Sequence, residues 1–153
     1  MIRLHPLTIE TMTPAEALTV RERLGISAHK MAQDLGVSSQ VVTYWEQPSP
    51  PGFTVPEEHA RYLHGWSVVF EDLVDETLAA AQALLLQYPD ARVRLGRYPV
   101  GINPPSLPDP YQGFDVPMHA ALVGLSSMML DRHRIAHTVE FIAPGQEGRF
   151  VNT

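Results

Sequence analysis

The chain has 153 residues, is 44% hydrophobic and carries a formal net charge of −6, so it is long enough for one or two small domains. It contains no cysteine, which excludes disulfides, thiolate nucleophiles and cysteine zinc sites and is typical of a reducing cytoplasm. No run of about 18 apolar residues is present and the first residues lack the order of a signal peptide, so we expect a cytoplasmic protein without a membrane span. The acidic balance argues against non-specific coating of nucleic acid, but not against a protein with a small DNA-binding face.

The first half of the sequence predicts a helix-turn-helix. A capping box formed by Thr13 and Glu16 opens a first helix, which Gly25 ends. Two further short helices over 27–35 and 37–45 are separated by a tight turn that contains Gly36. Apolar residues recur at helical spacing along all three and form the predicted core, namely Ala17, Leu18, Val20, Leu24, Met31, Ala32, Leu35, Val41, Val42 and Trp45.

Between residues 25 and 63 a series of short matches occurs in a fixed order: Met31-Ala32-Gln33, Leu35-Gly36-Val37-Ser38, Val42, Trp45-Glu46 and Val55-Pro56. This combination resembles the helix-turn-helix family of phage repressors and Cro-like proteins. The Trp-Glu pair and the Pro-Glu-Glu after it also resemble the helix-turn-helix regulators associated with anti-CRISPR operons. The proline-rich segment 47–53 departs from the family, which usually has a glycine and a few polar or basic residues there. The resemblance implies DNA binding.

Polar side chains on the outer face of the third helix are the candidates for DNA contacts, because a helix in the major groove presents such side chains to the base edges. Gln40 suits adenine, since its amide both donates and accepts, and Thr43 offers a methyl group to thymine. Ser38 and Ser39 either cap the helix or touch phosphate. The full candidate set is Lys30, Gln33, Ser38, Ser39, Gln40, Thr43 and Tyr44, in which the two residues of the second helix suit backbone phosphates. The alternative is that these residues form only a solvated helix face, and Glu46 is expected to bond within the domain.

The second half predicts an α+β arrangement. A fourth helix around 56–63 is followed, after Gly65, by a long amphipathic helix over 66–87 that ends before Pro89. A strand, a proline-rich loop, a helix and a second strand then follow over 91–98, 99–117, 118–129 and 138–142. Two strands are marginal on their own, so we expect this half to pair with a second copy.

Three arginines form a second basic feature. Arg92 and Arg94 lie on the same face of the predicted strand, with Arg97 near its end. They could contact phosphates or RNA. They could equally pair with the four carboxylates of the preceding helix, Glu71, Asp72, Asp75 and Glu76, and we favour such pairing.

The histidines suggest an enzyme or metal site only weakly. His133 and His137 are four residues apart, close to Asp131, and histidines at this spacing can share a metal on a helix. No glutamate occupies the general-base position between them, and Arg132 and Arg134 would repel a cation. His119 lies at the start of the same helix, and no other cluster of carboxylates and histidines is evident in the sequence. We therefore expect no metal and no cofactor, and interpret the basic residues as favourable at a helix C-terminus.

The sequence thus predicts a mostly helical protein with a helix-turn-helix bundle of four to five helices over 1–65 and a small α+β dimerisation domain over 66–153. The predicted function is that of a non-enzymatic transcriptional regulator, a repressor that binds a palindromic double-stranded DNA operator as a homodimer. The alternative is an antitoxin or adaptor whose C-terminal half binds a protein partner.

Overall fold

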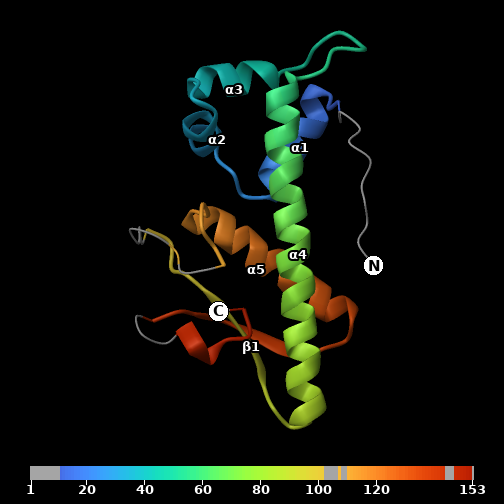
Figure 1. Cartoon of the computed structure of the whole chain (residues 1–153), viewed down its shortest axis with the longest axis vertical. Coiled ribbons are helices and arrows are strands. Elements are labelled where there is room, and N and C mark those ends of the chain that lie inside the picture. The colour runs from blue at the N-terminus through green and yellow to red at the C-terminus, as the bar shows by residue number, and fades with distance from the viewer. Residues whose placement is uncertain (1–10, 102–106, 108–109, 144–146, 153) are drawn as a thin grey trace. The chain divides into compact units, whose positions relative to one another are not determined.

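The computed structural model describes residues 11–101, 107, 110–143 and 147–152, and in that part of the chain it is mostly helical with one small sheet (Figure 1). This confirms the predicted fold class. The chain divides into two compact units, Met1–Val68 and Val69–Thr153. None of the described helices is both long enough and apolar enough to cross a lipid bilayer.

The first unit contains α1 (Pro14–Arg23), α2 (Ala28–Leu35), α3 (Ser39–Trp45) and the first part of α4. The predicted capping box is present at the start of α1, where the Thr13 hydroxyl accepts from the Glu16 amide at 3.2 Å and the Glu16 carboxylate accepts from the Thr13 amide at 2.8 Å. The fully buried apolar side chains of this unit include Ala17, Leu24, Ile26, Met31, Ala32, Val42, Ala60 and Leu63.

One predicted break is wrong. The fourth and fifth predicted helices are a single helix, α4 (Glu57–Gln87), which runs through Gly65 without interruption. A glycine inside a helix costs only about 1 kcal/mol relative to alanine, and neither a capping residue nor a proline adjoins Gly65 to stop the helix. The division between the units therefore falls inside α4, between Val68 and Val69, whereas the sequence suggested a boundary after Gly65.

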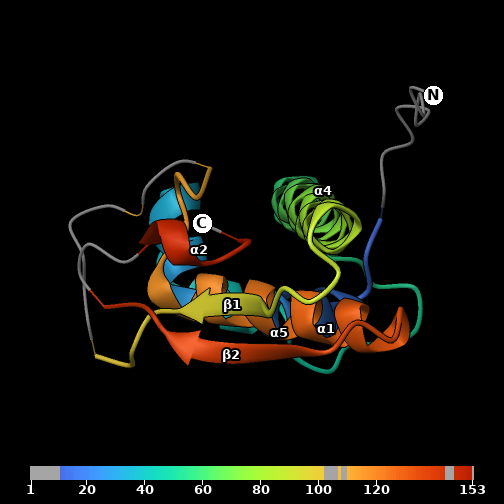
Figure 2. The same ribbon diagram turned by 90° about the horizontal axis from the view of Figure 1, so that it is seen from below.

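The second unit contains the rest of α4 and a β-α-β arrangement of β1 (Val93–Arg97), α5 (Val116–Arg132) and β2 (His137–Phe141). The strands are parallel, with Val93 opposite His137 and Arg97 opposite Phe141. Figure 2 shows them as neighbouring arrows that point the same way beside α5. The core of this unit is a fully buried cluster of Ala81, Val93, Leu95, Val123 and Leu130.

The two edges of the sheet differ. On the edge of β1 that faces away from β2, the side chain of Asn152 accepts from the Gly96 amide at 2.8 Å and donates to the Gly96 carbonyl at 3.0 Å. The Val151 amide also donates to the Arg94 carbonyl at 3.1 Å. The 3-10 helix η1 (Glu147–Arg149) leads into this segment. The outer edge of β2, in contrast, pairs with no strand in the described part of the chain.

Candidate nucleic-acid interface

The turn between α2 and α3 is fixed by its own hydrogen bonds. Gly36 ends α2 with φ +68°, a left-handed conformation that glycine adopts without strain. The Val37 amide donates to the Ala32 carbonyl at 3.0 Å, and the Ser38 hydroxyl accepts from the Val41 amide at 3.3 Å. The chain therefore passes from one helix to the next in a single defined conformation.

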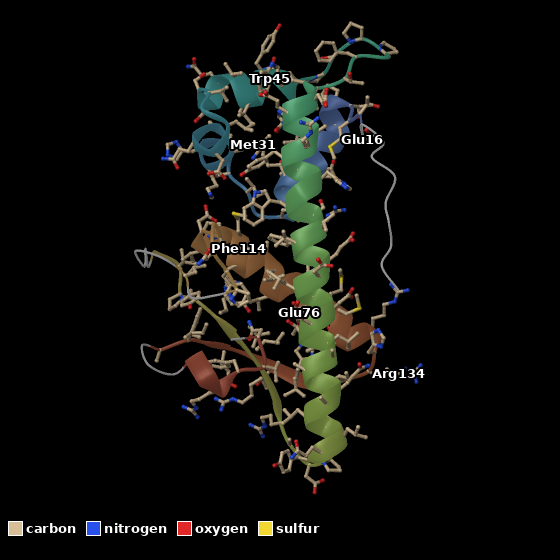
Figure 3. The ribbon with its side chains drawn as sticks, viewed as in Figure 1. Glu16, Met31, Trp45, Glu76, Phe114 and Arg134 are labelled. Carbon is tan, nitrogen blue, oxygen red and sulfur yellow. The ribbon has the colours of Figure 1, made fainter. Side chains whose placement is uncertain are left out.

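Apolar side chains hold α2 and α3 from the inside. Met31 of α2 and Val42 of α3 are 0% exposed, and Ala32 is 3% exposed. Figure 3 labels Met31 and Trp45 on their helices. Trp45 is less buried than the sequence suggested: it is half-buried and packs edge-on against the ring of His59, with centroids 5.6 Å apart. Four other predicted core residues are also only half-buried, namely Leu18, Val20, Leu35 and Val41.

A buried polar cluster joins α1, the end of α3 and α4. The Arg21 Nε donates to both carboxylate oxygens of Glu46 at 3.0 Å, and an Arg21 Nη1 hydrogen goes to the carbonyl of Ile26 at 2.9 Å. His59, which is 0% exposed, places its Nε2 2.9 Å from a Glu46 oxygen. Burial alone would raise the pKa of Glu46, but its contacts with His59 and Arg21 outweigh burial and hold that pKa below its usual value.

This cluster confirms that Glu46 bonds within its own domain. Its two partners were not identified from the sequence, because they lie on different helices. The available signal was weak: His59 shares a helical face with the apolar Ala60 and Leu63, where a buried histidine needs a polar neighbour.

The outer face of α3 presents three of the predicted DNA-contacting side chains together. Gln40 and Thr43 are exposed, and Tyr44 is 69% exposed. Ser39 is half-buried, so it contributes less surface than predicted. The exposed face of α3 thus combines an amide, a small β-branched side chain and an aromatic ring.

The hydroxyl groups of Ser38 and Thr43 are already engaged within the protein. The Ser38 hydroxyl caps α3, which is one of the two roles that the sequence left open for it. The Thr43 hydroxyl turns back and donates to the Gln40 carbonyl at 3.0 Å. The hydroxyl hydrogen of Thr43 is therefore already used within α3.

The two predicted phosphate contacts on α2 differ from each other. Gln33 is exposed. The Nζ of Lys30 instead lies 2.9 and 2.8 Å from the two oxygens of Asp34, and Asp34 also accepts from the Tyr62 hydroxyl at 2.7 Å. A contact between Lys30 and a phosphate would therefore require this ion pair to open.

Positive charge around the helix-turn-helix is sparse. Arg21 is bound to Glu46, Lys30 to Asp34 and Arg61 to Glu57. Among the lysines and arginines of residues 11–68, Arg23 alone forms no ion pair with a described carboxylate, and it is exposed. Residues 11–68 therefore leave little unpaired positive charge to attract a polyanion at long range.

The three arginines at and near β1, Arg92, Arg94 and Arg97, have different environments. Arg94 donates to both oxygens of Glu140 at 2.6 and 2.7 Å, and these bonds lower the pKa of Glu140 to about 2. The pairing is within the chain, but its partner is on β2 and not among the predicted carboxylates of α4. Arg92 is exposed, and Arg97 lies on the opposite face of β1 from Arg94.

The three C-terminal histidines do not converge. His133 is exposed at the end of α5, and His137 has Nε2 2.6 Å from the Ser127 hydroxyl and Nδ1 2.9 Å from the Ile135 carbonyl. His119 is 0% exposed and packs edge-on against Tyr98 and Tyr111, with centroids 4.9 and 4.8 Å away. Within the described ranges, no three histidine, aspartate or glutamate side chains are grouped as a metal site would require.

Comparison with known proteins adds no assignment: no protein-family model matches the chain, and a search of curated proteins finds no match.

Proposed function

We propose that this protein is a sequence-specific DNA-binding transcriptional regulator that places α3 in the major groove and binds as a homodimer. The observation that carries the proposal is the two-sided character of α3. Its inner side is held by Val42 and by Glu46, while Gln40, Thr43 and Tyr44 are exposed together on the other side. A short helix held rigidly after a tight turn suits insertion into the major groove.

The chemistry of the exposed residues supports base recognition. The Gln40 amide suits the N6 and N7 edge of adenine, and the free methyl of Thr43 suits the methyl of thymine. Because Arg23 is the one lysine or arginine of residues 11–68 without an ion pair to a described carboxylate, sequence discrimination depends on these base contacts more than on phosphate neutralisation.

The proposed dimer uses the free edge of β2. The Ile142 amide donates to the Arg97 carbonyl at 2.8 Å, and amides alternate in direction along a strand, so the backbone groups of Val139 and Phe141 point away from β1. Their side chains are 45% and 66% exposed. An exposed apolar strand edge is a template for pairing with another chain.

A second copy fits this edge because the strand is self-complementary. Antiparallel pairing about a two-fold axis at Val139 sets the two copies of Val139 opposite each other and each Phe141 opposite a His137. Glu140 is placed opposite Thr138 and is already neutralised by Arg94 of its own chain, so no like charges meet. The pairing would extend each marginal two-stranded sheet to four strands.

Selection of genomic fragments with the full chain, followed by fluorescence anisotropy on the enriched sequence, tests DNA recognition. Gln40→Ala should weaken specific binding by about 1–3 kcal/mol and relax preference at one base pair. Gln82→Ala, which changes an exposed glutamine of the second unit, is the matched control and should bind as the parent does. If Gln40→Ala, Thr43→Ala and Tyr44→Ala all bind the selected sequence as tightly as the parent, α3 is not the recognition helix.

Light scattering at micromolar concentration tests the dimer, since one chain has a mass of 17.0 kDa. Phe141→Lys should give the monomer mass, whereas Leu86→Lys, at a site that is 87% exposed on α4, should leave the dimer intact. Val139→Pro should also give a monomer while keeping the fold, because it removes only an amide that points away from β1. The proposed dimer would be contradicted if the parent protein were monomeric. It would also be contradicted if a different protein bound the outer edge of β2 in a defined complex.

A further inference from the structure

The second unit contains a hollow of about 380 Å³ where β1 ends and α5 begins. Residues just after β1 form one side of it, and the first turn of α5 forms the other through Val116, Pro117 and Ala120. Figure 2 shows the arrowhead of β1 and the start of α5 at the same end of this unit. In α/β folds with parallel strands, ligands bind outside the carboxyl ends of the strands. The volume is within the range of small-molecule sites.

Arg97, the last residue of β1, lines this hollow and forms no ion pair with any residue that the structure describes. Its Nε is buried without a hydrogen-bond partner, and no described carboxylate lies within ion-pair distance of its guanidinium. Arg94, three positions earlier and therefore on the other face of the sheet, differs in this respect, because its guanidinium donates to both carboxylate oxygens of Glu140. A partly buried guanidinium that no described carboxylate neutralises favours an anion in the hollow that it lines.

The remaining walls determine the class of ligand. Val100, Val116, Pro117 and Ala120 present apolar surface, and Tyr98 and Gly101 complete the lining. The ring of His119, which packs against Tyr98, carries no positive charge near neutral pH, because burial and the charge of Arg97 lower its pKa to about 4. The site therefore combines one cationic fork with an apolar body.

We propose that this hollow binds a small organic carboxylate, whose charged end is held by Arg97 and whose apolar end lies against Val116 and Ala120. Guanidinium and carboxylate groups match in shape and form paired hydrogen bonds, which favours a carboxylate over a spherical anion. The proposal does not depend on DNA binding, because its test measures the ligand alone.

Titration calorimetry and amide chemical-shift mapping with octanoate and benzoate test the proposal on the full chain. We expect saturable binding with shifts at Arg97 and Ala120, at least tenfold weaker binding of octanamide and benzamide, and no competition from chloride. Arg97→Gln should weaken octanoate binding at least tenfold, and Ala120→Leu should abolish it by filling the hollow. Arg92→Gln changes an exposed arginine outside the hollow and should bind octanoate as the parent does.

Three results would overturn the proposal. The amides could bind as tightly as the acids, Arg92→Gln could weaken binding as much as Arg97→Gln, or no probe could show saturable binding at millimolar concentration. Far-UV circular dichroism and the Tm of each variant establish that it is folded. If Ala120→Leu is unfolded, Val116→Phe is used in place of that variant, because it narrows the same hollow from a partly exposed position.

Discussion

The Nε of Arg21 is shared equally by the two oxygens of Glu46, each 3.0 Å away, although the two residues are 25 positions apart in the sequence. This contact ties the last turn of α1 to the end of α3. Because Glu46 is 6% exposed, removing its charge would leave Arg21 half-buried without a carboxylate. The position of α3 therefore depends on a charge pair as well as on apolar packing.

We predict that Glu46→Gln lowers the free energy of unfolding at pH 7 by about 3 kcal/mol, as expected when one partner of a buried pair loses its charge. The pKa of Glu46 is lower in the folded state than its ordinary value of 4.5. Its contribution to stability is consequently present above pH 4.5 and is lost as the pH falls through the folded-state pKa. Urea unfolding at several pH values should show this acid loss in the parent and a weaker one in Glu46→Gln. The exposed Glu58→Gln is the control, and an equal effect of the two substitutions would refute the prediction.

Asp34→Asn should strengthen DNA binding severalfold. The substitution frees Lys30 for a phosphate and removes a negative charge beside the proposed interface, while the amide oxygen can still accept from Tyr62. The lost i,i+4 ion pair is worth only about 0.3–0.5 kcal/mol of stability. Anisotropy titrations over a range of salt should give a slope steeper by about one phosphate contact. Asp72→Asn makes the same charge change at an exposed site in the second unit, and an equal gain there would show that net charge alone is responsible.

His119 should make the second unit sensitive to mild acid. Burial, followed by the charge of Arg97, lowers its pKa from 6.5 to about 4, so the unfolded chain takes up its proton more readily. Stability is therefore highest above pH 6.5 and falls by roughly 3 kcal/mol as the pH drops to about 4. His119→Phe keeps a ring against Tyr98 and Tyr111 but cannot titrate, so its unfolding free energy should vary less over this interval. An unchanged pH profile in the variant would exclude His119 as the cause.

Gly96→Ala should destabilise the protein by about 1–3 kcal/mol through overpacking. A Cβ at this position would lie 2.7 Å from a side-chain carbon of Ile142 and 2.8 Å from the ring of Phe150. Gly124→Ala is the matched control, since Gly124 is an exposed residue of α5 and, beyond its own stretch of helix, nothing lies within 4 Å of the added carbon. Alanine there should stabilise the helix by about 0.5–1 kcal/mol. Thermal unfolding of the two variants should therefore shift in opposite directions.

Local signals in the sequence predicted most of the helix starts. The side chains of the capping residues Thr13, Ser27 and Ser38 each accept a hydrogen bond from an amide three residues further along the chain. A short stretch of sequence is therefore enough to predict these caps. The predicted break at Gly65 was wrong because whether a glycine ends a helix depends on the residues that pack beside it, which a local pattern does not show. The strands and α5 were also predicted, with ends that differ from the structure by only a few residues.

Pairings between distant residues were not predictable. The sequence contains several carboxylates that could pair with Arg94. Glu140 is its partner because the parallel register of β1 and β2 places the two side chains next to each other. In the candidate interface, helical periodicity identified Gln40, Thr43 and Tyr44 as one face. It could not reveal that the Thr43 hydroxyl bonds to its own helix or that Lys30 is paired, because these depend on rotamers.

The one-sided pairing of β2 also sets how fast its amides exchange with deuterium. The amides of Thr138 and Glu140 point toward β1 and should exchange slowly, whereas those of Val139 and Phe141 point outward and should exchange within the time of exposed backbone. In β1 the amides that face β2 are paired, and on the other edge the Gly96 amide donates to Asn152, so this amide should also exchange slowly. Protection from exchange should therefore alternate from residue to residue along β2. If two copies pair at the outer edge of β2, raising the protein concentration should slow exchange of the Val139 and Phe141 amides before that of the others.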